Sequence, residues 1–167
     1  DVCSSDLLAA FAEGEWFMND QWSATVGGRV MWSDIFGAHA IPRAYIVWQP
    51  MEALSVKGGV AAGYKTPDVR QLFNGRYKLA QGNSYYGDPD LKPEESWSYE
   101  LSSTAEIGGI ASVTLGGFFT QFKNMLANEE IKSRIYKAVN HGRVESKGVE
   151  LLFKTVPVWN TRFTGGY

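Results

Sequence analysis

Few side chains in this sequence could take part in chemistry directly. The two histidines, His39 and His141, are far apart in the chain, and neither has a partner at the spacing that metal sites or catalytic pairs use. The single cysteine, Cys3, excludes an internal disulfide and a cysteine-based metal site. We therefore expect no catalytic residue, no bound metal and no resident cofactor, and we do not expect an enzyme.

Carboxylates cluster in the stretch GDPDLKPEES, residues 87–96. A calcium loop would need the DxDxDG spacing, which this stretch lacks. Pro89 and Pro93 instead fix the backbone torsion φ and restrict the residue that precedes each of them. We interpret the stretch as a rigid connection that leads back into a strand.

Positive charge concentrates in two segments of a chain whose net charge is −2. Residues 65–86 hold four basic side chains and one acidic one, and residues 123–143 hold five basic and two acidic ones. Aromatic rings lie among these cations, and under the family resemblance described below the two groups together suit an anionic, aromatic ligand through Coulomb attraction and cation–π contact. A basic belt that contacts membrane phosphates is the alternative. The candidate ligand-binding residues are Arg70, Arg76, Tyr77, Lys78, Tyr85 and Tyr86.

The elements that position these residues are predicted to be β-strands. Aromatic residues make up 14% of the chain, 18 residues are glycine, and side chains alternate with a period of two in segments such as WSATVGGRVMW, residues 22–32. The pattern predicts an all-β protein of eight strands at about 8–17, 22–32, 42–49, 54–64, 96–106, 111–124, 139–156 and 161–167.

The connections between these strands alternate in length. Tight turns are expected at Asn19–Gln21, Pro50–Ala53, Ile107–Ile110 and Pro157–Asn160. Longer segments are expected at about 33–41, 65–95 and 125–138. Short turns at one end of a sheet and long loops at the other are typical of a transmembrane β-barrel.

The composition of the strand faces distinguishes lipid from a protein core. The apolar faces contain many small residues, such as Gly28, Gly58 and Gly117, whereas a packed core needs bulk to fill space. Trp22 and Trp32 stand at the two ends of one strand, and about ten residues tilted by about 40° span the apolar band of an outer membrane. A membrane barrel is favoured, and a soluble β-sandwich or jelly roll is the alternative.

Several stretches resemble one known family when they are taken in order. These are FAEGEW, GGRVMWSDIFGAHAIPRAYIVWQP, VKGGVAAGYKTPDVRQL, GDPDLKPEESWSYEL, FFTQFKNML and NHGRVESKGVELLF. They are similar to segments of TonB-dependent outer-membrane receptors, and DIFGAH with PRAYIVW resembles most closely the ferric-catecholate (enterobactin-like) siderophore and colicin receptor branch. The chain departs from the family pattern at Asp88, Glu95 and His141.

The resemblance implies a fold and a partial domain. The family fold is a 22-stranded antiparallel barrel closed around a plug. Residues 8–167 are then part of that barrel, with the plug domain and the C-terminal strands absent, and we do not expect this stretch alone to transport. The first residues, DVCSSDL (1–7), resemble a translated sequencing adapter, with a genuine N-terminal loop as the alternative.

The resemblance also implies a function. We expect an outer-membrane receptor of a Gram-negative bacterium that takes up a ferric siderophore of the catecholate class, with Fe(III)-siderophore as cargo. Haem or cobalamin is the alternative cargo, and a passive porin-like barrel is a further alternative. The expected partners are the TonB–ExbB–ExbD system, reached through the plug, and outer-membrane lipid with lipopolysaccharide. Colicin or phage binding stays open, and no nucleic acid is expected.

Overall fold

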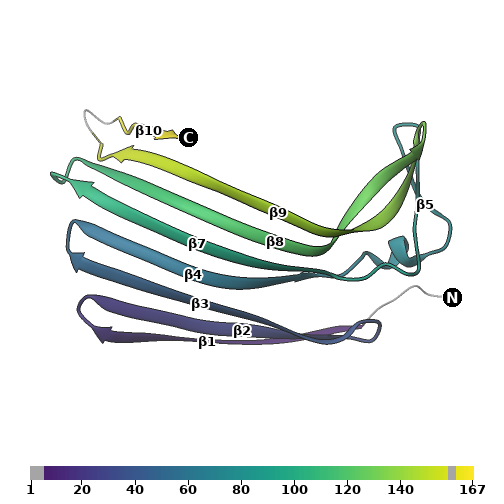
Figure 1. The fold of residues 1–167 in the computed structure, drawn as a ribbon, viewed down its shortest axis with the longest axis horizontal. Helices are drawn as coiled ribbons and strands as arrows, with labels where there is room; N and C mark the ends of the chain where they lie inside the picture. Colours follow the sequence, from purple (N-terminus) through teal and green to yellow (C-terminus); the bar gives the residue numbers. More distant parts are fainter. Residues whose placement is uncertain (1–5, 158–160) are drawn as a thin grey trace.

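The computed structural model describes residues 6–157 and 161–167, which form a single curved sheet (Figure 1). The ten strands follow the order β1-β2-β3-β4-β7-β8-β9-β6-β5, and β10 pairs with β9. The strands are β1 (Leu7–Asn19), β2 (Trp22–Ser33), β3 (Gly37–Met51), β4 (Leu54–Lys65), β5 (Arg76–Ala80), β6 (Asn83–Tyr86), β7 (Glu94–Ile107), β8 (Ala111–Lys132), β9 (Ile135–Thr155) and β10 (Thr164–Gly166), and a 3-10 helix η1 covers Val69–Leu72.

The long strands form an antiparallel meander in which chain neighbours pair, and local chemistry sets their turns. The side-chain Oδ1 of Asn19 accepts hydrogen bonds from the backbone N–H groups of Gln21 and Trp22, both at 2.9 Å, and so closes the β1–β2 turn. Gly108 and Gly109 adopt φ values of +57° and +69° in the β7–β8 turn, where a side chain would be strained. The predicted β-strand content of the chain is confirmed.

The register of the ladders places apolar side chains on one face of the sheet. One row of directly paired residues runs Val26, Ala44, Val60, Tyr99 and Phe119 from β2 to β8. The next row towards the short turns runs Ala24, Ile46, Gly58, Leu101, Gly117 and Val149. No second layer of the described chain covers this face, which we call the convex face, and Val149 is 71% exposed.

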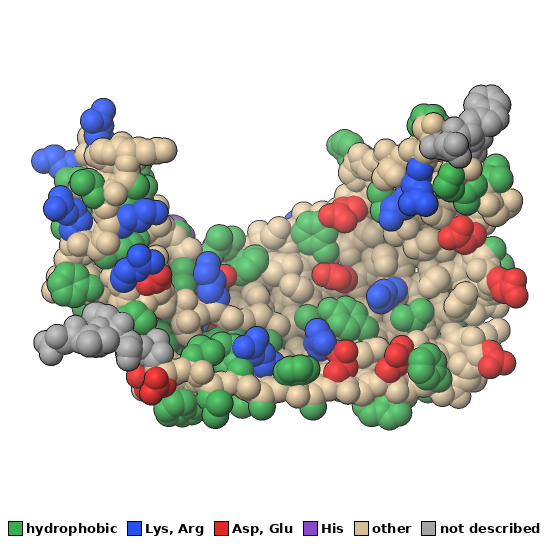
Figure 2. All heavy atoms as spheres, turned by 180° about the vertical axis from the view of Figure 1, so that it is seen from behind, with side chains coloured by type: hydrophobic (Ala, Val, Ile, Leu, Met, Phe, Trp, Pro, Cys, Tyr) green, Lys and Arg blue, Asp and Glu red, His purple; other side chains and the backbone are tan. Residues whose placement is uncertain are grey.

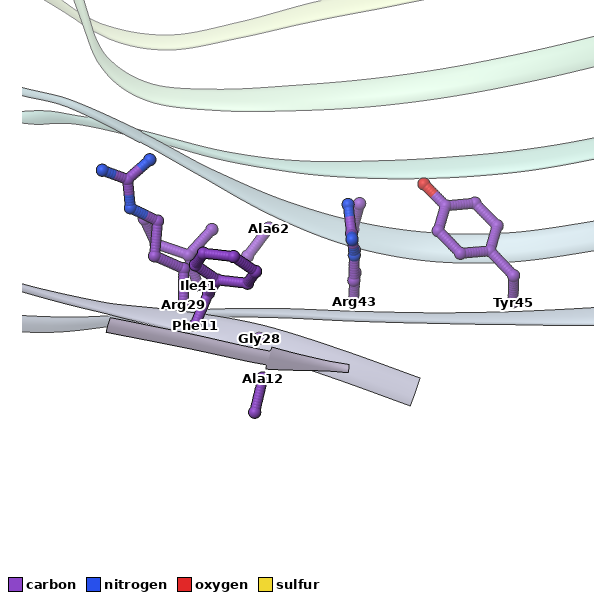
Figure 3. A pocket seen from close by; sticks show the side chains of 9 residues that line it. Phe11, Ala12, Gly28, Arg29, Ile41, Arg43, Tyr45 and Ala62 are labelled. Atoms are coloured by element: carbon purple, nitrogen blue, oxygen red, sulfur yellow. The ribbon is translucent and has the colours of Figure 1, made fainter. Parts of the chain in front are cut away.

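The opposite face is polar and lines the inside of the curve, and we call it the concave face. Figure 2 shows acidic and basic side chains scattered over a hollowed surface of the molecule. In the close view, Arg43 and Tyr45 point from β3 into the curve, whereas Ala12 points away from it (Figure 3). Glu13 of β1 pairs with Arg43. A polar inner face and an apolar outer face are the arrangement of an outer-membrane barrel wall.

Little of the described chain is buried in a conventional core. Leu91 and Ala138 are the buried hydrophobic residues within 6–157 and 161–167. Both lie near the end of the sheet that carries the longer connections. The soluble β-sandwich interpretation requires a second sheet packed on the apolar face, and the described residues form one sheet.

Two of the three predicted long loops are wrong. The segment at 33–41 contains only a turn at residues 34–36, because β3 begins at Gly37. The segment at 125–138 continues β8 and β9 as a long hairpin that turns at Ser133 and Arg134. Both faces of this hairpin carry polar residues, so the alternation that marks a strand disappears while the backbone pairing continues.

Some predictions fall at the edges of the described chain. The expected turn at Pro157–Asn160 lies largely outside the described residues, which omit 158–160. The first five residues of the expected adapter segment are also outside them, and Leu7 pairs with Ser33. The adapter origin stays a prediction. The described part of the chain contains no helix of the length and apolarity needed to cross a membrane.

Candidate ligand-binding site

Of the three predicted long connections, the one between β4 and β7 is the one that leaves the barrel wall. It begins with η1, whose N-cap is Asp68. The carboxylate of Asp68 accepts from the backbone N–H of Arg70 at 2.9 Å, and the side chain of Gln71 accepts from the backbone N–H of Asp68 at 3.0 Å. This capping box holds η1 directly after the end of β4.

The hairpin of β5 and β6 extends the sheet beyond the barrel wall. β6 pairs in parallel with β9, with Tyr85 opposite Tyr136, and the backbone N–H of Ser84 donates to the carbonyl of Arg134 at 2.8 Å. Figure 1 shows β5 beside the far ends of β8 and β9. The extension of the β8–β9 hairpin past the wall therefore provides the edge on which the loop hairpin docks.

The stretch that returns to β7 is fixed by side chains rather than by a strand. Asn140 accepts from the backbone N–H of Lys92 at 2.8 Å and donates to the carbonyls of Lys92 at 2.9 Å and Asn124 at 2.8 Å. Glu94 accepts from the backbone N–H of Leu126 at 2.8 Å. These contacts support the interpretation of the stretch as a rigid connection.

Asp88 has a structural partner of its own. Its carboxylate lies 2.7 Å from Nζ of Lys137, and it also accepts from the backbone N–H of Asp90 at 2.9 Å. The hydrogen bond from Lys137 is the main cause that lowers the pKa of Asp88 below its usual value. Asp88 thus serves to attach the loop to β9.

A cavity of about 590 Å³ lies where the exit of β4, η1 and β5 meet. Three of the six candidate residues line it: Arg70, Tyr77 and Lys78. The other lining residues are Lys65, Thr66, Pro67, Asp68, Gln71 and Asn128. We call this space the loop cavity, and its lining contains three cations and one carboxylate.

The charges of the loop cavity are only partly compensated. Arg70 donates to Asp68 through Nη2 at 2.9 Å and through Nε at 3.1 Å, and these bonds lower the pKa of Asp68 and raise that of Arg70. Lys78 places its Nζ over the ring of Tyr85, 5.3 Å from the ring centroid. Neither Lys65 nor Lys78 has a carboxylate partner among the described residues. The cavity therefore favours an anion.

One tyrosine, Tyr77, lines the cavity, and Tyr85 and Tyr136 lie next to it outside the lining. The ring of Tyr85 lies 6.4 Å from that of Tyr77 and stacks on that of Tyr136 at 5.1 Å, measured between centroids. The hydroxyl of Tyr77 donates to Asn128 at 3.2 Å, so the β8 extension holds this ring in place. Cations and π-faces thus converge on one site, as an anionic aromatic ligand requires.

The structure brings together only some of the candidate residues. Arg70, Tyr77, Lys78 and Tyr85 form one group, whereas Arg76 and Tyr86 are cross-strand partners that do not line the loop cavity. Sequence reasoning left Tyr136 and Asn128 out of the candidate set, because their approach depends on the docking of β6 on β9. Lys65 belongs to the basic segment at residues 65–86. Its position at the end of a predicted strand is the signal that could have identified it as a lining residue of the loop cavity.

The histidines occupy ordinary positions on strands. His39 stacks on Tyr64 with ring centroids 4.0 Å apart, and Nε2 of His141 lies 3.5 Å from Glu129. Within the described ranges, no three His, Cys, Asp or Glu side chains are grouped so that they could hold a metal ion.

A second cavity lies on the concave face of the wall. It has a volume of about 460 Å³, and Arg29, Arg43, Tyr45 and Phe11 are among its lining residues (Figure 3). Arg43 is paired with Glu13. This cavity lies along the strands, away from the loop hairpin, and we assign it to the inner surface of the wall.

Comparisons with known proteins agree with this architecture. A family model described as TonB dependent receptor-like, beta-barrel, matches residues 3–167. The chain is 35% identical over 135 residues to the iron-regulated outer membrane virulence protein of Vibrio cholerae serotype O1. This alignment covers 81% of this chain and 21% of that protein. The chain therefore spans about a fifth of the length of this curated relative.

Solved structures of similar shape are also receptors. The siderophore receptor PirA from Pseudomonas aeruginosa has a TM-score of 0.80 at 18% identity, over 96% of this chain and 33% of that one. The ferric enterobactin receptor PfeA in complex with BCV-L6 has a TM-score of 0.77 at 21% identity, over 97% of this chain and 26% of that one. At these identities the likeness shows the fold alone.

The apolar convex face, the polar concave face and the relatives place the chain in the wall of a β-barrel in the outer membrane of a Gram-negative bacterium. The chain belongs to the family of TonB-dependent receptor-like β-barrels.

Proposed function

We propose that this chain is part of a receptor that takes up a ferric siderophore of the catecholate class across the outer membrane, and that the loop cavity contributes to the binding site. The relative named as iron-regulated and the similar fold of siderophore receptors support iron as the cargo. The receptor holds and passes on its cargo and makes or breaks no covalent bond.

One observation carries the proposal: uncompensated cations and tyrosine rings converge in the loop cavity. A ferric tris-catecholate is anionic and aromatic, so Lys65 and Lys78 supply Coulomb attraction while Tyr77 offers a ring in the cavity lining. A volume of about 590 Å³ is within the range of ligand pockets. The cavity lies at the end of the sheet that carries the long connection, and the general rule that long loops of outer-membrane barrels are extracellular supports a position outside the cell.

Energy for transport comes, in this proposal, from the TonB–ExbB–ExbD system acting on a plug domain inside the closed barrel. The concave face of this chain is then the wall of the vestibule through which the cargo passes. Lipid surrounds the convex face.

Uptake of radioactive iron by cells that carry the full-length receptor tests the proposal. We expect ferric catecholate to be taken up when TonB is present, and only bound at the surface when TonB is deleted. Ferric hydroxamate, which carries less negative charge and no catechol ring, serves as the matched ligand and should be taken up poorly. Equal uptake of both ligands would contradict the catecholate assignment, and uptake of iron without TonB would contradict energised transport.

A further inference from the structure

A short link, residues 73–75, joins η1 to β5 and contains the one Asn-Gly pair of the sequence, Asn74 and Gly75. Asn74 is exposed. The backbone nitrogen that follows an asparagine can attack the side-chain amide of that asparagine, and glycine hinders the approach least because it has no side chain. The residue types and the exposure therefore make this link a candidate site of covalent modification.

The local structure keeps the attacking nitrogen close to release. The backbone N–H of Gly75 donates to the carbonyl of Phe73 at 2.8 Å, which closes a three-residue turn centred on Asn74. A Cβ atom on residue 75 would lie 2.6 Å from the ring of Phe73, so a larger residue there would displace that ring. The attack requires this turn to open, and exposed loop segments open at a low cost in free energy.

A second asparagine of the same loop has its following nitrogen held in a sheet. Asn83 begins β6, and the backbone N–H of Ser84, the residue after it, donates to the carbonyl of Arg134 at 2.8 Å. This bond is part of the docking of β6 on β9, so it opens only when the loop hairpin leaves the wall. The fold thus separates a reactive asparagine from a protected one within a few residues.

We propose that Asn74 is a site of spontaneous deamidation. The deprotonated backbone nitrogen of Gly75 attacks Cγ of Asn74, a C–N bond forms, and the side-chain nitrogen leaves as ammonia after it takes a proton from water. The resulting cyclic imide then adds one water molecule. Opening at one carbonyl gives aspartate, and opening at the other gives isoaspartate. The sum of the steps is one water consumed and one ammonia released, with no change in oxidation state.

The products alter the loop cavity from outside its lining. Arg70 and Gln71 line the cavity before the link, and Tyr77 and Lys78 line it after the link. Isoaspartate carries the chain through its side-chain carbon, so it inserts one extra backbone carbon between η1 and β5. Both products also add a carboxylate to the stretch between the cations Arg70 and Lys78, which weakens the attraction of the cavity for an anion.

Mass spectrometry of the full-length receptor tests the modification. The receptor is incubated in water enriched in heavy oxygen, and the oxygen gained at each asparagine is measured over time. We expect Asn74 to convert about ten-fold faster than Asn83, to give both aspartate and isoaspartate, and to react faster as the pH rises, because the attacking nitrogen must lose its proton. Conversion of Asn74 that is no faster than that of Asn83 would overturn the proposal.

The effect on the cavity rests on the proposed function and is measured separately. The affinity for ferric catecholate is compared between fresh and incubated wild type, with Asn74→Gln, which forms the imide far more slowly, as the matched control. We expect incubation to weaken binding by the wild type and to leave that of the variant unchanged. Full affinity after complete conversion of Asn74 would overturn the effect on the cavity. A fresh receptor that does not bind ferric catecholate would overturn the proposed function instead, and the heavy-oxygen measurement would still decide the modification.

Discussion

At the scale of single residues, side chains from the barrel wall decide where the loop lies. Asn140 forms hydrogen bonds with the backbone N–H and carbonyl of Lys92, in the connection that leads to β7, and with the carbonyl of Asn124. Lys137 pairs with Asp88 in the same connection. Asp68, the N-cap of η1, pairs with the guanidinium of Arg70 and so leaves Lys65 and Lys78 as the uncompensated cations. The loop cavity therefore depends in part on Asn140, Lys137 and Asp88, which are not among its lining residues.

Replacing Asn140 with alanine should loosen the connection at residues 88–93. The change removes three hydrogen bonds and leaves the N–H and carbonyl of Lys92 without these partners, which we expect to cost about 1–2 kcal/mol locally. Hydrogen exchange of the amides in this segment measures the effect. Exposed Asn74 in the same loop is the matched control, and exchange that rises equally in Asn74→Ala would contradict the assigned role.

Acid should release the same loop. The pKa of Asp88 is lowered in the folded protein, so the stability that Asp88 contributes to the loop is fully present above its unfolded pKa of about 3.9. That stability is lost as the pH falls through the folded pKa. We expect hydrogen exchange of residues 84–90 to be constant from pH 7 to about 5, after correction for the intrinsic rate, and to rise below about pH 4. Asp88→Asn should remove this acid step, and a step that persists in the variant would assign it to other carboxylates.

At the scale of elements, the alternation of apolar and polar side chains predicts the strands that have one face in lipid. Strand positions from Trp22 to Ser33 and from Leu54 to Lys65 follow the predicted segments closely, because one face meets lipid and the other meets water. The extension of β8 and β9 past Lys123 could not be predicted in this way, since both of its faces carry polar residues and Asn124, with φ of +54°, departs from strand geometry where the extension begins. The docking of β6 on β9 is a contact between distant segments and left no local signal.

A charge on the two faces of β2 should have unequal effects. Val26→Lys puts an ammonium on the convex face, while Thr25→Lys puts one on the concave face beside Glu15 and Tyr45. We expect the first change to cost about 2–4 kcal/mol more than the second if Val26 lies near the midplane. The folded, heat-resistant fraction of the full-length receptor in outer-membrane extracts reports the difference. Equal losses in both variants would contradict the assignment of the two faces.

At the scale of the whole molecule, the chain is a curved wall with a long loop at one end. The far ends of β8 and β9 carry the loop hairpin of β5 and β6, and β5 lines the loop cavity. The sequence allowed the basic and aromatic character of residues 65–86 to be predicted, and four of the six candidate residues do come together. Arg76 and Tyr86 are cross-strand partners on β5 and β6 that do not line the loop cavity, and their part in ligand binding stays a prediction.

The affinity of the full-length receptor for ferric catecholate tests the central claim most directly, with two charge-matched double variants. Lys65→Gln with Lys78→Gln removes the uncompensated cations of the loop cavity, and Arg76→Gln with Lys132→Gln removes two cations that do not line it. We predict that the first variant binds at least ten-fold more weakly in equilibrium titrations at low salt, while the second binds within two-fold of the wild type. Equal affinity of the first variant and the wild type would contradict the claim that the loop cavity holds the siderophore.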